Sequence, residues 1–397
     1  MKNNWQVKKL GQEGVAKVIY GKAKPEEDGS VPVIGSSGIY SYTKAPLVTK
    51  PTIIVGRKGT AGVAYYSENP CWPSDTAFYL DINFDLFDPK FLYLFITHKK
   101  LDGQHSKTTL PSLKRQDLEE LLVPLLDLQE QKNIVSIMDT VQEAIKIQSE
   151  AIENTKELKA ALMQKLFTEG IKGEKLKDSE IGKIPESWKV IKFATEDSGI
   201  EFIDGDRGSN YPKNNEFSAE GYCLFLSTKN VPGERFDFEE CSFITEEKDR
   251  LLRKGKLQRG DIVLTTRGTV GNVAIYDQET RYENVRINSG MVILRNKNPE
   301  LETEFLLTVL RSSIFCNQVL TNHSGSAQPQ LPIGILRRLI FVLPKRDEQK
   351  VIIEIINAIN EKIGLEQKKK DLYQELFEAM LDKLMSGEIN VDKVNFS

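Results

Sequence analysis

The feature that most constrains this chain is an internal repeat. Glu130-Gln131-Lys132 returns as Glu348-Gln349-Lys350, and this offset of 218 residues holds without a gap for about forty residues. It places "ELKAALMQKLFTEGI" at 157–171 on "ELFEAMLDKLMSGEI" at 375–389. Self-similarity of this length indicates a duplicated structural unit, so the fold of the first half should recur in the second.

The match extends upstream with changing offsets. Three further pairs of segments resemble each other: "NWQVKKL" (4–10) and "SWKVIKF" (187–193), "RKGTAGVAYY" (57–66) and "TRGTVGNVAIY" (266–276), and Leu110-Pro111 and Leu331-Pro332. The offset grows from 183 at Trp5 and Trp188 to about 220 at the Leu-Pro pairs. The second copy therefore carries extra residues in its middle.

Each copy of the repeated phrase opens a long run without proline, from 125 to 184 and from 345 to the end. Apolar residues recur there in adjacent rows at seven-residue spacing: Ile134, Val141, Leu162, Met138, Ile145, Ile152 and Leu166 in the first run, and Ile352, Ile359, Tyr373, Met380, Ile356, Ile363, Phe377 and Leu384 in the second. Such rows are typical of a coiled-coil seam. About 40 residues at 1.5 Å each predict rods of roughly 60 Å.

The seam is weaker in the middle of each run. Polar residues replace apolar ones at Gln148, Thr155, Glu366 and Lys370, and Gly364 interrupts the second copy. Polar seam residues lower stability and fix the register of the two helices. The alternative is a pair of ordinary core helices that belong to the globular blocks, but their length favours an extended pair.

The blocks before the two runs have a mixed α/β pattern. "TIIVGRKGTAGVAYY" and "DIVLTTRGTVGNVAIY" each read as two strands joined at a glycine-containing turn, and "DPKFLYLFITHKKL" and "LETEFLLTVLRSSIF" predict short helices in matching places. We therefore predict a mixed α/β (α+β) fold in which a long antiparallel two-helix coiled coil separates two globular domains, related by a pseudo-twofold repeat. The predicted boundaries are 1–124 for the first globular domain, 125–170 for the first helix, 171–186 for a linker, 187–344 for the second globular domain and 345–388 for the second helix.

Charge is unevenly distributed along the chain. The net charge is -3, but residues 127–169 and 346–388 each carry -3, which leaves +3 for the rest. The densest basic stretches are 97–115, with five Lys/Arg against one Asp, and 249–267, with six Lys/Arg against two acids. Basic stretches separated from the acidic helices are compatible with nucleic-acid binding.

Several classes of site and location find no support in the sequence. The four cysteines have no CxxC spacing and the three histidines no ligand spacing, so we expect neither a metal site nor a disulfide framework. No apolar run approaches the roughly 20 residues of a membrane helix, and the N-terminus lacks a signal peptide. We expect a cytoplasmic protein.

Two fragments resemble enzyme motifs without their context. "NPCW" is similar to the Asn-Pro-Pro-aromatic motif of adenine N6-methyltransferases, but Cys71 replaces the second proline and no glycine-rich donor loop accompanies it. The Glu-x-Lys of "EQK" is similar to nuclease metal sites, but both copies begin a heptad run, where acids favourably meet a helix N-terminus. We predict no catalytic residues.

The whole pattern resembles the specificity (S) subunits of type I restriction-modification enzymes. Those proteins alternate two divergent target-recognition domains with two similar helical regions. The marks are "LPSLKRQDLEELLVPLLDLQEQKNIV" and "GSAQPQLPIGILRRLIFVLPKRDEQKVII" before the helices, and "LFTEGIKGEKLKDSEIGKIPESWKV" after the first. The first block departs from the family in having "GQHSKTTLPSL" where Gly-Ser-x-Gln-Pro is usual.

The resemblance implies a non-catalytic, sequence-specific DNA-recognition subunit that reads a bipartite target. Its two domains would be held apart by the coiled coil, and it would dock two methyltransferase (M) subunits, with two motor-nuclease (R) subunits joining for cleavage. This chain would need no cofactor, whereas its partners would use S-adenosylmethionine, ATP and Mg²⁺. No membrane partner is implied, and the sequence leaves open whether the isolated chain self-associates.

The candidate DNA contacts of the first domain are polar residues at the glycine turn and around the Leu-Pro pair, and those of the second domain play the analogous part. Arg, Asn and Gln suit bidentate base contacts, whereas Lys and Thr mostly serve phosphates. In the first domain they are Arg57, Lys58, Thr60, Lys107, Thr108, Thr109, Lys114 and Arg115. In the second they are Arg207, Asn210, Lys229, Asn230, Arg267, Thr269, Ser324, Gln328 and Gln330. For each of them a solvated surface charge or turn residue is the alternative.

Two other functions compete with this interpretation. One is an enzyme, a methyltransferase or nuclease with its site inside one block, and an assay of the purified chain would reveal it. The other is a coiled-coil adaptor that never touches nucleic acid, which would leave the basic stretches unexplained.

Overall fold

The computed structural model describes residues 5–24, 28–101, 112–322, 330–389 and 391. It divides into two compact units, of which the first comprises 1–151 and 366–397 and the second comprises 152–365. Both units mix helices with antiparallel sheets, which confirms the predicted mixed α/β class. Within the described residues, no helix combines the length and apolar character needed to cross a membrane.

The first unit contains two main sheets. The four-stranded sheet has the order β2-β8-β5-β6 and is antiparallel throughout, with β2 Ala16–Tyr20, β8 Ala77–Ile82, β5 Thr52–Gly56 and β6 Ala64–Ser67. The three-stranded sheet has the order β4-β3-β7, with β4 Gly38–Thr43, β3 Val31–Gly35 and β7 Trp72–Pro73. A two-stranded ladder joins β1 Val7–Lys9 to β9 Leu122–Pro124, and the short helices are α1 Pro89–His98 and α2 Arg115–Glu119.

The second unit repeats this topology. Its four-stranded sheet has the order β13-β19-β16-β17, with β13 Ile200–Asp204, β19 Met291–Asn296, β16 Ile262–Thr265 and β17 Val273–Ile275. Its three-stranded sheet has the order β15-β14-β18, with β15 Phe243–Ile244, β14 Cys223–Leu226 and β18 Val285–Ile287. As in the first unit, one outer strand of the three-stranded sheet is parallel to the central strand and the other is antiparallel. The remaining elements are β10 Leu176–Ser179, β11 Gly182–Pro185, β12 Lys189–Lys192, β20 Ile340–Leu343, α4 Glu246–Leu251, α5 Thr303–Leu310, α6 Ser313–Asn322, α7 Ile333–Leu336 and three 3-10 turns, Glu196–Ser198, Asn214–Glu216 and Thr228–Asn230.

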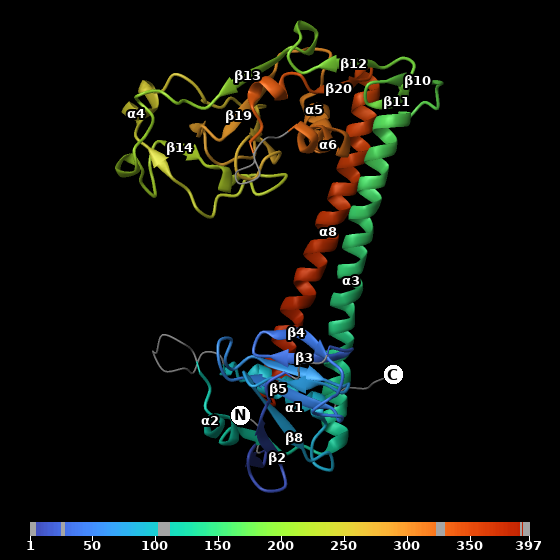
Figure 1. Cartoon of the computed structure of the whole chain (residues 1–397), viewed down its shortest axis with the longest axis vertical. Coiled ribbons are helices and arrows are strands. Elements are labelled where there is room, and N and C mark those ends of the chain that lie inside the picture. Colours follow the sequence, from blue (N-terminus) through green and yellow to red (C-terminus); the bar gives the residue numbers. More distant parts are fainter. Residues whose placement is uncertain (1–4, 25–27, 102–111, 323–329, 390, 392–397) are drawn as a thin grey trace. The chain divides into compact units, whose positions relative to one another are not determined.

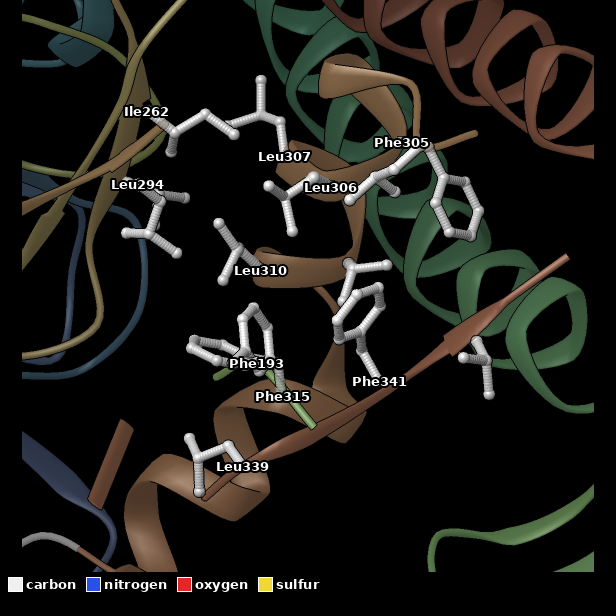
Figure 2. Packing of buried hydrophobic residues seen from close by; sticks show 14 of the residues in the cluster. Phe193, Ile262, Leu294, Phe305, Leu306, Leu307, Leu310, Phe315, Leu339 and Phe341 are labelled. Atoms are coloured by element: carbon white, nitrogen blue, oxygen red, sulfur yellow. The ribbon is translucent and has the colours of Figure 1, made fainter. Parts of the chain in front are cut away.

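The core of the second unit is rich in aromatic side chains. Phe193 packs against Phe315 and Phe341 with ring centroids 5.6 and 4.7 Å apart, and Figure 2 shows these rings together with the leucines of α5. Aromatic pairs at such distances contribute beyond the apolar area that they bury. This cluster joins the helices to the four-stranded sheet, because it includes Phe305 of α5 and Leu294 of β19.

Two long helices run through the chain, α3 Leu128–Glu169 with 42 residues and α8 Arg346–Met385 with 40. Figure 1 shows each of them as one continuous helix, and α8 passes through Gly364 without a break. The predicted long helices are therefore confirmed. Two of the polar seam residues, Gln148 and Thr155, are buried as that seam requires.

The two long helices are antiparallel. In the first unit, Ile134 and Met138 near the start of α3 share a core with Leu381 and Leu384 near the end of α8. In the second unit the ends exchange roles, because residues near the end of α3 share a core with residues near the start of α8: Met163, Leu166, Phe167, Ile352, Ile353 and Ile356. Each unit is thus completed by two chain segments that lie far apart in the sequence.

The glutamine of the repeated phrase explains why the phrase recurs. Gln131 is fully buried, where its amide nitrogen donates to the carbonyl oxygens of Leu86 (2.8 Å) and Leu126 (2.9 Å), and its amide oxygen accepts from the N–H of Asp88 (2.8 Å). Asp88 is the N-cap residue of α1. A buried amide whose two N–H donors and oxygen are all hydrogen-bonded fixes the start of a long helix to the start of the short one.

Gln349 makes the same three bonds in the second unit. Its amide nitrogen donates to the carbonyl oxygens of Glu300 (2.8 Å) and Pro344 (3.0 Å), and its amide oxygen accepts from the N–H of Glu302, the N-cap residue of α5, at 2.8 Å. The neighbouring Glu348 is also buried, and its carboxylate accepts from the N–H of Ile171 at 3.3 Å and lies 3.3 Å from the ammonium of Lys172. The repeated residues therefore serve the structure, because they hold each long helix to neighbouring segments of the same unit by buried hydrogen bonds.

Candidate nucleic-acid interface

The second unit presents a basic turn between β16 and β17. Gly268 and Gly271 have φ angles of 72° and 97°, a conformation that L side chains rarely adopt, and the N–H of Gly271 bonds the carbonyl oxygen of Thr265 at 3.0 Å. The chain reverses direction tightly here. Arg267, directly before Gly268, and Thr269, directly after it, are both exposed. The sequence-predicted turn is therefore present, with both polar side chains directed away from the core.

Three other segments meet at this turn. The N–H of Arg267 bonds the carbonyl oxygen of Gly290 (3.2 Å), and Gln330 forms a β-bridge with Arg267. Thr228 also lies close to the turn, since a Cβ added to Gly268 would be 3.7 Å from its hydroxyl oxygen. The structure therefore brings three predicted contacts, Arg267, Thr269 and Gln330, to one place. It adds Thr228, which the sequence did not single out.

Arg207 joins this surface from the loop after β13. One guanidinium nitrogen donates to the carbonyl oxygen of Ser289 at 3.3 Å and to the carboxylate of Asp204 at 3.2 Å. The close approach depends on Gly205, where any Cβ would overlap the carbonyl oxygen of Asn288. Because Ser289 precedes Gly290, Arg207 lies next to the segment that holds the basic turn.

A cavity of about 380 Å³ lies beside Arg207, and its lining residues are Asp204, Gly205, Asp206, Arg207, Gly208, Ser209, Asn210, Leu251, Arg253 and Lys254. The backbone N–H of Gly208, and with it that of Arg253, holds the pKa of Asp206 below its usual range despite burial. The carboxylate thus shapes the loop through backbone N–H groups, including those of Arg207, Arg253 and Lys254. The amide of Asn210 donates to the carbonyl oxygen of Leu251 at 3.3 Å.

Among the described residues, the other two predicted contacts of the second unit, Lys229 and Asn230, differ from each other. The side chain of Lys229 is 82% exposed, and its ammonium lies 3.7 Å from the carboxylate of Glu240. Asn230 is 4% exposed; its amide donates to the carbonyl oxygens of Asp237 (3.0 Å) and Glu240 (2.8 Å) and accepts from the N–H of Ser227 (2.9 Å). All of its bonds serve the loop, so we leave Asn230 out of the proposed surface.

The first unit builds the same frame around Arg57 and Lys58. The N–H of Arg57 bonds the carbonyl oxygen of Thr76 at 2.9 Å, and Lys58 forms a β-bridge with Ser112. Gly59 and Gly62 again have positive φ angles of 74° and 89°, which leaves Lys58 and Thr60 exposed. Ser36 takes the place of Thr228, since a Cβ on Gly59 would lie 3.5 Å from its hydroxyl oxygen.

Two arginines of the first unit share one aromatic ring. The guanidinium carbon of Arg57 lies 5.1 Å from the ring centroid of Tyr20, and that of Arg115 lies 6.0 Å from the same centroid. Arg115 also pairs with Glu119 at 2.7 Å, and Lys114 beside it is exposed. The predicted Arg57, Lys114 and Arg115 are therefore close together although about sixty residues of chain separate them.

The structure corrects the sequence match between the two Leu-Pro pairs. The N–H of Leu331 bonds the carbonyl oxygen of Thr266 (2.9 Å), and the residue that makes the equivalent bond, to Arg57 (3.0 Å), is Leu113. Leu113 and not Leu110 is therefore the counterpart of Leu331, which restores the constant offset of 218 residues. With this offset Pro111 aligns with Pro329. The match of Leu110-Pro111 to Leu331-Pro332 was three residues out of register and therefore a coincidence.

Five predicted contacts lie outside the described residues, and the structure says nothing of them: Lys107, Thr108, Thr109, Ser324 and Gln328. Residues that the sequence did not single out include Ser36, Thr76, Thr228, Ser289, Arg253 and Lys254. The last two lie in the basic stretch 249–267, whose charge was the available signal. The others are small polar residues that only the folded chain brings to the turns.

Comparison with known proteins agrees with this architecture. The model of the type I restriction modification DNA specificity domain matches residues 2–158 and 201–373. The type I restriction enzyme MjaVIII specificity subunit of Methanocaldococcus jannaschii is 29% identical over 313 residues, which cover 77% of this chain and 72% of that protein.

Two solved structures have a similar fold along the whole chain. A chain from work on the complex assembly and conformational transition of the type I R-M system has a TM-score of 0.62 at 17% identity, covering 97% of this chain and 98% of that one. The type I restriction-modification system S subunit from M. genitalium has a TM-score of 0.53 at 16% identity, with 97% of both chains covered. At these identities the likeness shows the fold alone. The family model, in contrast, matches most of the chain in two segments, so the chain belongs to the family of type I restriction-modification DNA specificity subunits.

Proposed function

We propose that this chain is the DNA-recognition subunit of a type I restriction-modification complex and that each unit reads one half of a bipartite target. The observation that carries the proposal is the basic turn built twice. Lys58 and Arg267 occupy equivalent, exposed places in a backbone frame that is the same in both units. Their neighbours differ, as two half-sites of different sequence require.

The chemistry of the two turns suits different contacts. Arg267 offers the planar fork that pairs with the O6 and N7 atoms of guanine in the major groove. Lys58, a compact charge on a flexible stem, suits a phosphate, and each phosphate contact makes binding more sensitive to salt. We therefore assign Lys58 chiefly to positioning, and Arg267 with Gln330 chiefly to base recognition.

We further propose that the long helices set the distance between the half-sites. Helices of 42 and 40 residues are roughly 60 Å long at 1.5 Å per residue. Because B-DNA rises 3.4 Å per base pair, such a spacer corresponds to a little under about 20 base pairs. The target would then contain two read halves and an unread gap.

Exchange of the first globular block tests this assignment. Replacing residues 1–124 with the corresponding block of a relative should change one half of the methylated motif and leave the other half intact, because each unit reads its own half-site. The measurement is a map of N6-methyladenine in the DNA of a host that expresses the chain with its methyltransferase. A Leu122→Ala variant, which alters an exposed side chain on β9, is the control and should keep the motif. Change in both halves, or in neither, would contradict the proposal.

We propose that catalysis belongs to partner subunits, two methyltransferase and two motor-nuclease subunits, which bring S-adenosylmethionine, ATP and Mg²⁺. Two copies of one partner need two similar docking surfaces, and the long helices offer them. Ile147 of α3 and its repeat counterpart Leu365 of α8 are 57% and 66% exposed, and Leu158 and Leu376, which are again equivalent, are 57% and 44% exposed. Large apolar side chains left exposed at the same places of both repeats support a partner that binds twice.

Introducing a charge into this repeated apolar surface should change the number of methyltransferase subunits that bind. An Ile147→Glu variant should retain one methyltransferase subunit, Leu365→Glu should also retain one, and the double variant should retain none, because each glutamate removes one apolar contact surface. The measurement is the mass of the co-purified complex by size-exclusion chromatography with light scattering. Gln142→Glu with Gln367→Glu adds the same charge at exposed polar positions of the two helices and should leave two partners bound. A double variant that still carries two partners would exclude this surface.

A further inference from the structure

The first unit joins two strands of its three-stranded sheet in a tight, exposed hairpin, whereas a long segment joins the equivalent strands of the second unit. Strands β3 and β4 are joined by Ser36 and Ser37 alone, and β4 forms the edge of its sheet. Three large side chains of this short strand face solvent, Ile39 at 57%, Tyr40 at 55% and Tyr42 at 51% exposed. Edge strands with this much exposed apolar surface are prone to unwanted association, so their persistence points to a use.

A β-bulge directs Tyr40. Ile34 pairs with Ile39 and Val33 pairs with Ser41, so Tyr40 is an extra residue on β4 without a partner across the ladder. Bulges of this kind bend a strand and redirect a side chain, and they are frequent next to functional sites. Here the bulge interrupts the alternation of the strand, and two successive large residues, Ile39 and Tyr40, are both exposed.

The ring of Tyr40 lies near the basic turn of the first unit, which carries Arg57 and Lys58. A Cβ added to Gly35 would be 3.1 Å from Cε1 of Tyr40 and 3.0 Å from the hydroxyl oxygen of Thr76. The carbonyl oxygen of Thr76 in turn accepts the N–H of Arg57 at 2.9 Å and that of Lys58 at 3.4 Å. The Tyr40 ring and the turn that carries the two cationic residues therefore lie in the same neighbourhood, around Thr76.

The second unit replaces this hairpin with buried structure. The equivalent outer strand, β15, holds Phe243 and Ile244 at 7% and 0% exposure. Between β14 and β15 lie residues 227–242, which include Lys229 and the buried Asn230, in place of the two serines of the first unit. The second copy thus carries extra residues in the connection that the first unit makes with two serines.

We propose that Ile39 and Tyr40 enter a groove of the DNA duplex and read bases of the half-site that belongs to the first unit. This inference rests on the proposed DNA-reading function and names the residues that give that unit its specificity. Duplex DNA is the occupant that the charges favour, because Arg57 and Lys58 of the adjacent turn both bond Thr76 and supply positive charge that suits DNA phosphates.

The geometry of a hairpin suits that groove. The major groove, about 12 Å wide, admits a two-stranded β-ribbon. Ile39 can contact the methyl group of thymine, and the hydroxyl of Tyr40 can donate to or accept from base edges, so the pair discriminates between bases while Lys58 contacts a phosphate. This division of labour separates the effects of the two kinds of residue in a binding experiment.

The test uses the full-length chain and a library of duplexes with a randomised centre. Selection of bound duplexes with the wild-type chain defines its two half-sites, and fluorescence anisotropy then compares the best selected duplex with a scrambled one at several salt concentrations. Tyr40→Ala and Ile39→Ala should each lower the ratio of the two affinities by about tenfold or more and leave the salt dependence unchanged. Lys58→Ala should weaken both duplexes equally and reduce the slope of log K against log salt by about one.

A repeated selection with the Tyr40→Ala chain locates the effect. Base preference should disappear from positions in one half-site and persist in the other, which a general loss of folding does not produce. Leu122→Ala, an exposed change of the same kind in the same unit, should select the wild-type site. If Tyr40→Ala keeps the wild-type affinity ratio, the inference is overturned.

Two further outcomes are equally decisive. If Tyr40→Ala binds DNA as the wild type does but loses a co-purifying protein subunit, the hairpin is a protein interface and the inference is wrong. If the wild-type chain itself selects no duplex, the proposed function fails, and this inference falls with it.

Discussion

A Gln349→Leu chain should lose on the order of 3 kcal/mol of unfolding free energy in its second unit. Leucine has a similar size but leaves the N–H of Glu302 and the carbonyl oxygens of Glu300 and Pro344 without the bonds they make to Gln349. Each buried polar group left unsatisfied costs about 1–3 kcal/mol, whereas the leucine itself gains little in a site shaped for an amide. The effect should be local, since all four residues belong to the second unit.

Hydrogen exchange measures this loss and locates it. Amide protection should fall around the start of α5 in Gln349→Leu and around the start of α1 in Gln131→Leu, because the two glutamines hold equivalent N-cap residues. Gln367→Leu, on an exposed face of α8 where the amide bonds only Asp371, is the matched control and should change stability by less than about 0.5 kcal/mol. Equal stability of Gln349→Leu and the control would show that the three hydrogen bonds of Gln349 do not contribute to stability.

The second large effect concerns the buried arginine of β18. Arg286 is 6% exposed; its guanidinium donates to the carboxylate of Asp249 at 2.5 Å and to the carbonyl oxygens of Lys254 (2.6 Å), Asp249 (2.8 Å) and Leu252 (3.1 Å). Arg286→Met should destabilise the second unit by about 3–5 kcal/mol, because it leaves a buried carboxylate with a single remaining ion-pair partner, Lys256. Urea unfolding followed by circular dichroism measures the change.

The pH dependence of this loss follows from the carboxylate. Burial opposes ionisation of Asp249, but hydrogen bonds from Lys256 and Arg286 outweigh it and hold the pKa of the carboxyl below its usual range. A lowered folded-state pKa contributes stability above the ordinary carboxyl range, and this contribution is lost as the pH falls through the folded-state value. The difference between wild type and Arg286→Met should therefore be largest near neutral pH and shrink in acid.

Arg250 supplies the matched control for Arg286. It lies on α4, its side chain is 75% exposed, and it pairs with Glu246 one helical turn away. Exposed pairs of this kind contribute little, so Arg250→Met should cost less than about 0.5 kcal/mol at every pH. A loss in Arg286→Met that matches this control, or that grows in acid, would contradict the assigned role of the pair.

The repeat made the large features of the fold predictable. Heptad spacing and the absence of proline predicted both long helices, since these signals act over neighbouring turns of one segment. The order of the strands was beyond the sequence, because β2 pairs with β8 across more than fifty residues and nothing local specifies that partner. The pairing of Leu110 with Leu331 failed for a related reason, as backbone bonds and not matching letters decide which residues are equivalent.

The candidate site was predictable only in part. The glycines before Thr60 and Thr269 predicted the turns, because glycine is the residue that most readily adopts a positive φ angle. Thr76 and Gly290, which support these turns through carbonyl oxygens, carry no such signature. Asn230 was predicted as a base contact because of its amide, but the amide donates to the carbonyl oxygens of Asp237 and Glu240. The sequence alone cannot reveal these hydrogen bonds.

The antiparallel helix pair also dictates when the first unit can be finished during synthesis. Its core contains Leu10 and Ile134, which are made early, and Leu384 and Met385, which are made late. The ribosome must therefore synthesise the chain as far as Met385 before these core side chains of the first unit are all present. By then every residue of the second unit, which is confined to 152–365, has already been synthesised. The part of the protein that is translated first is the last that can close.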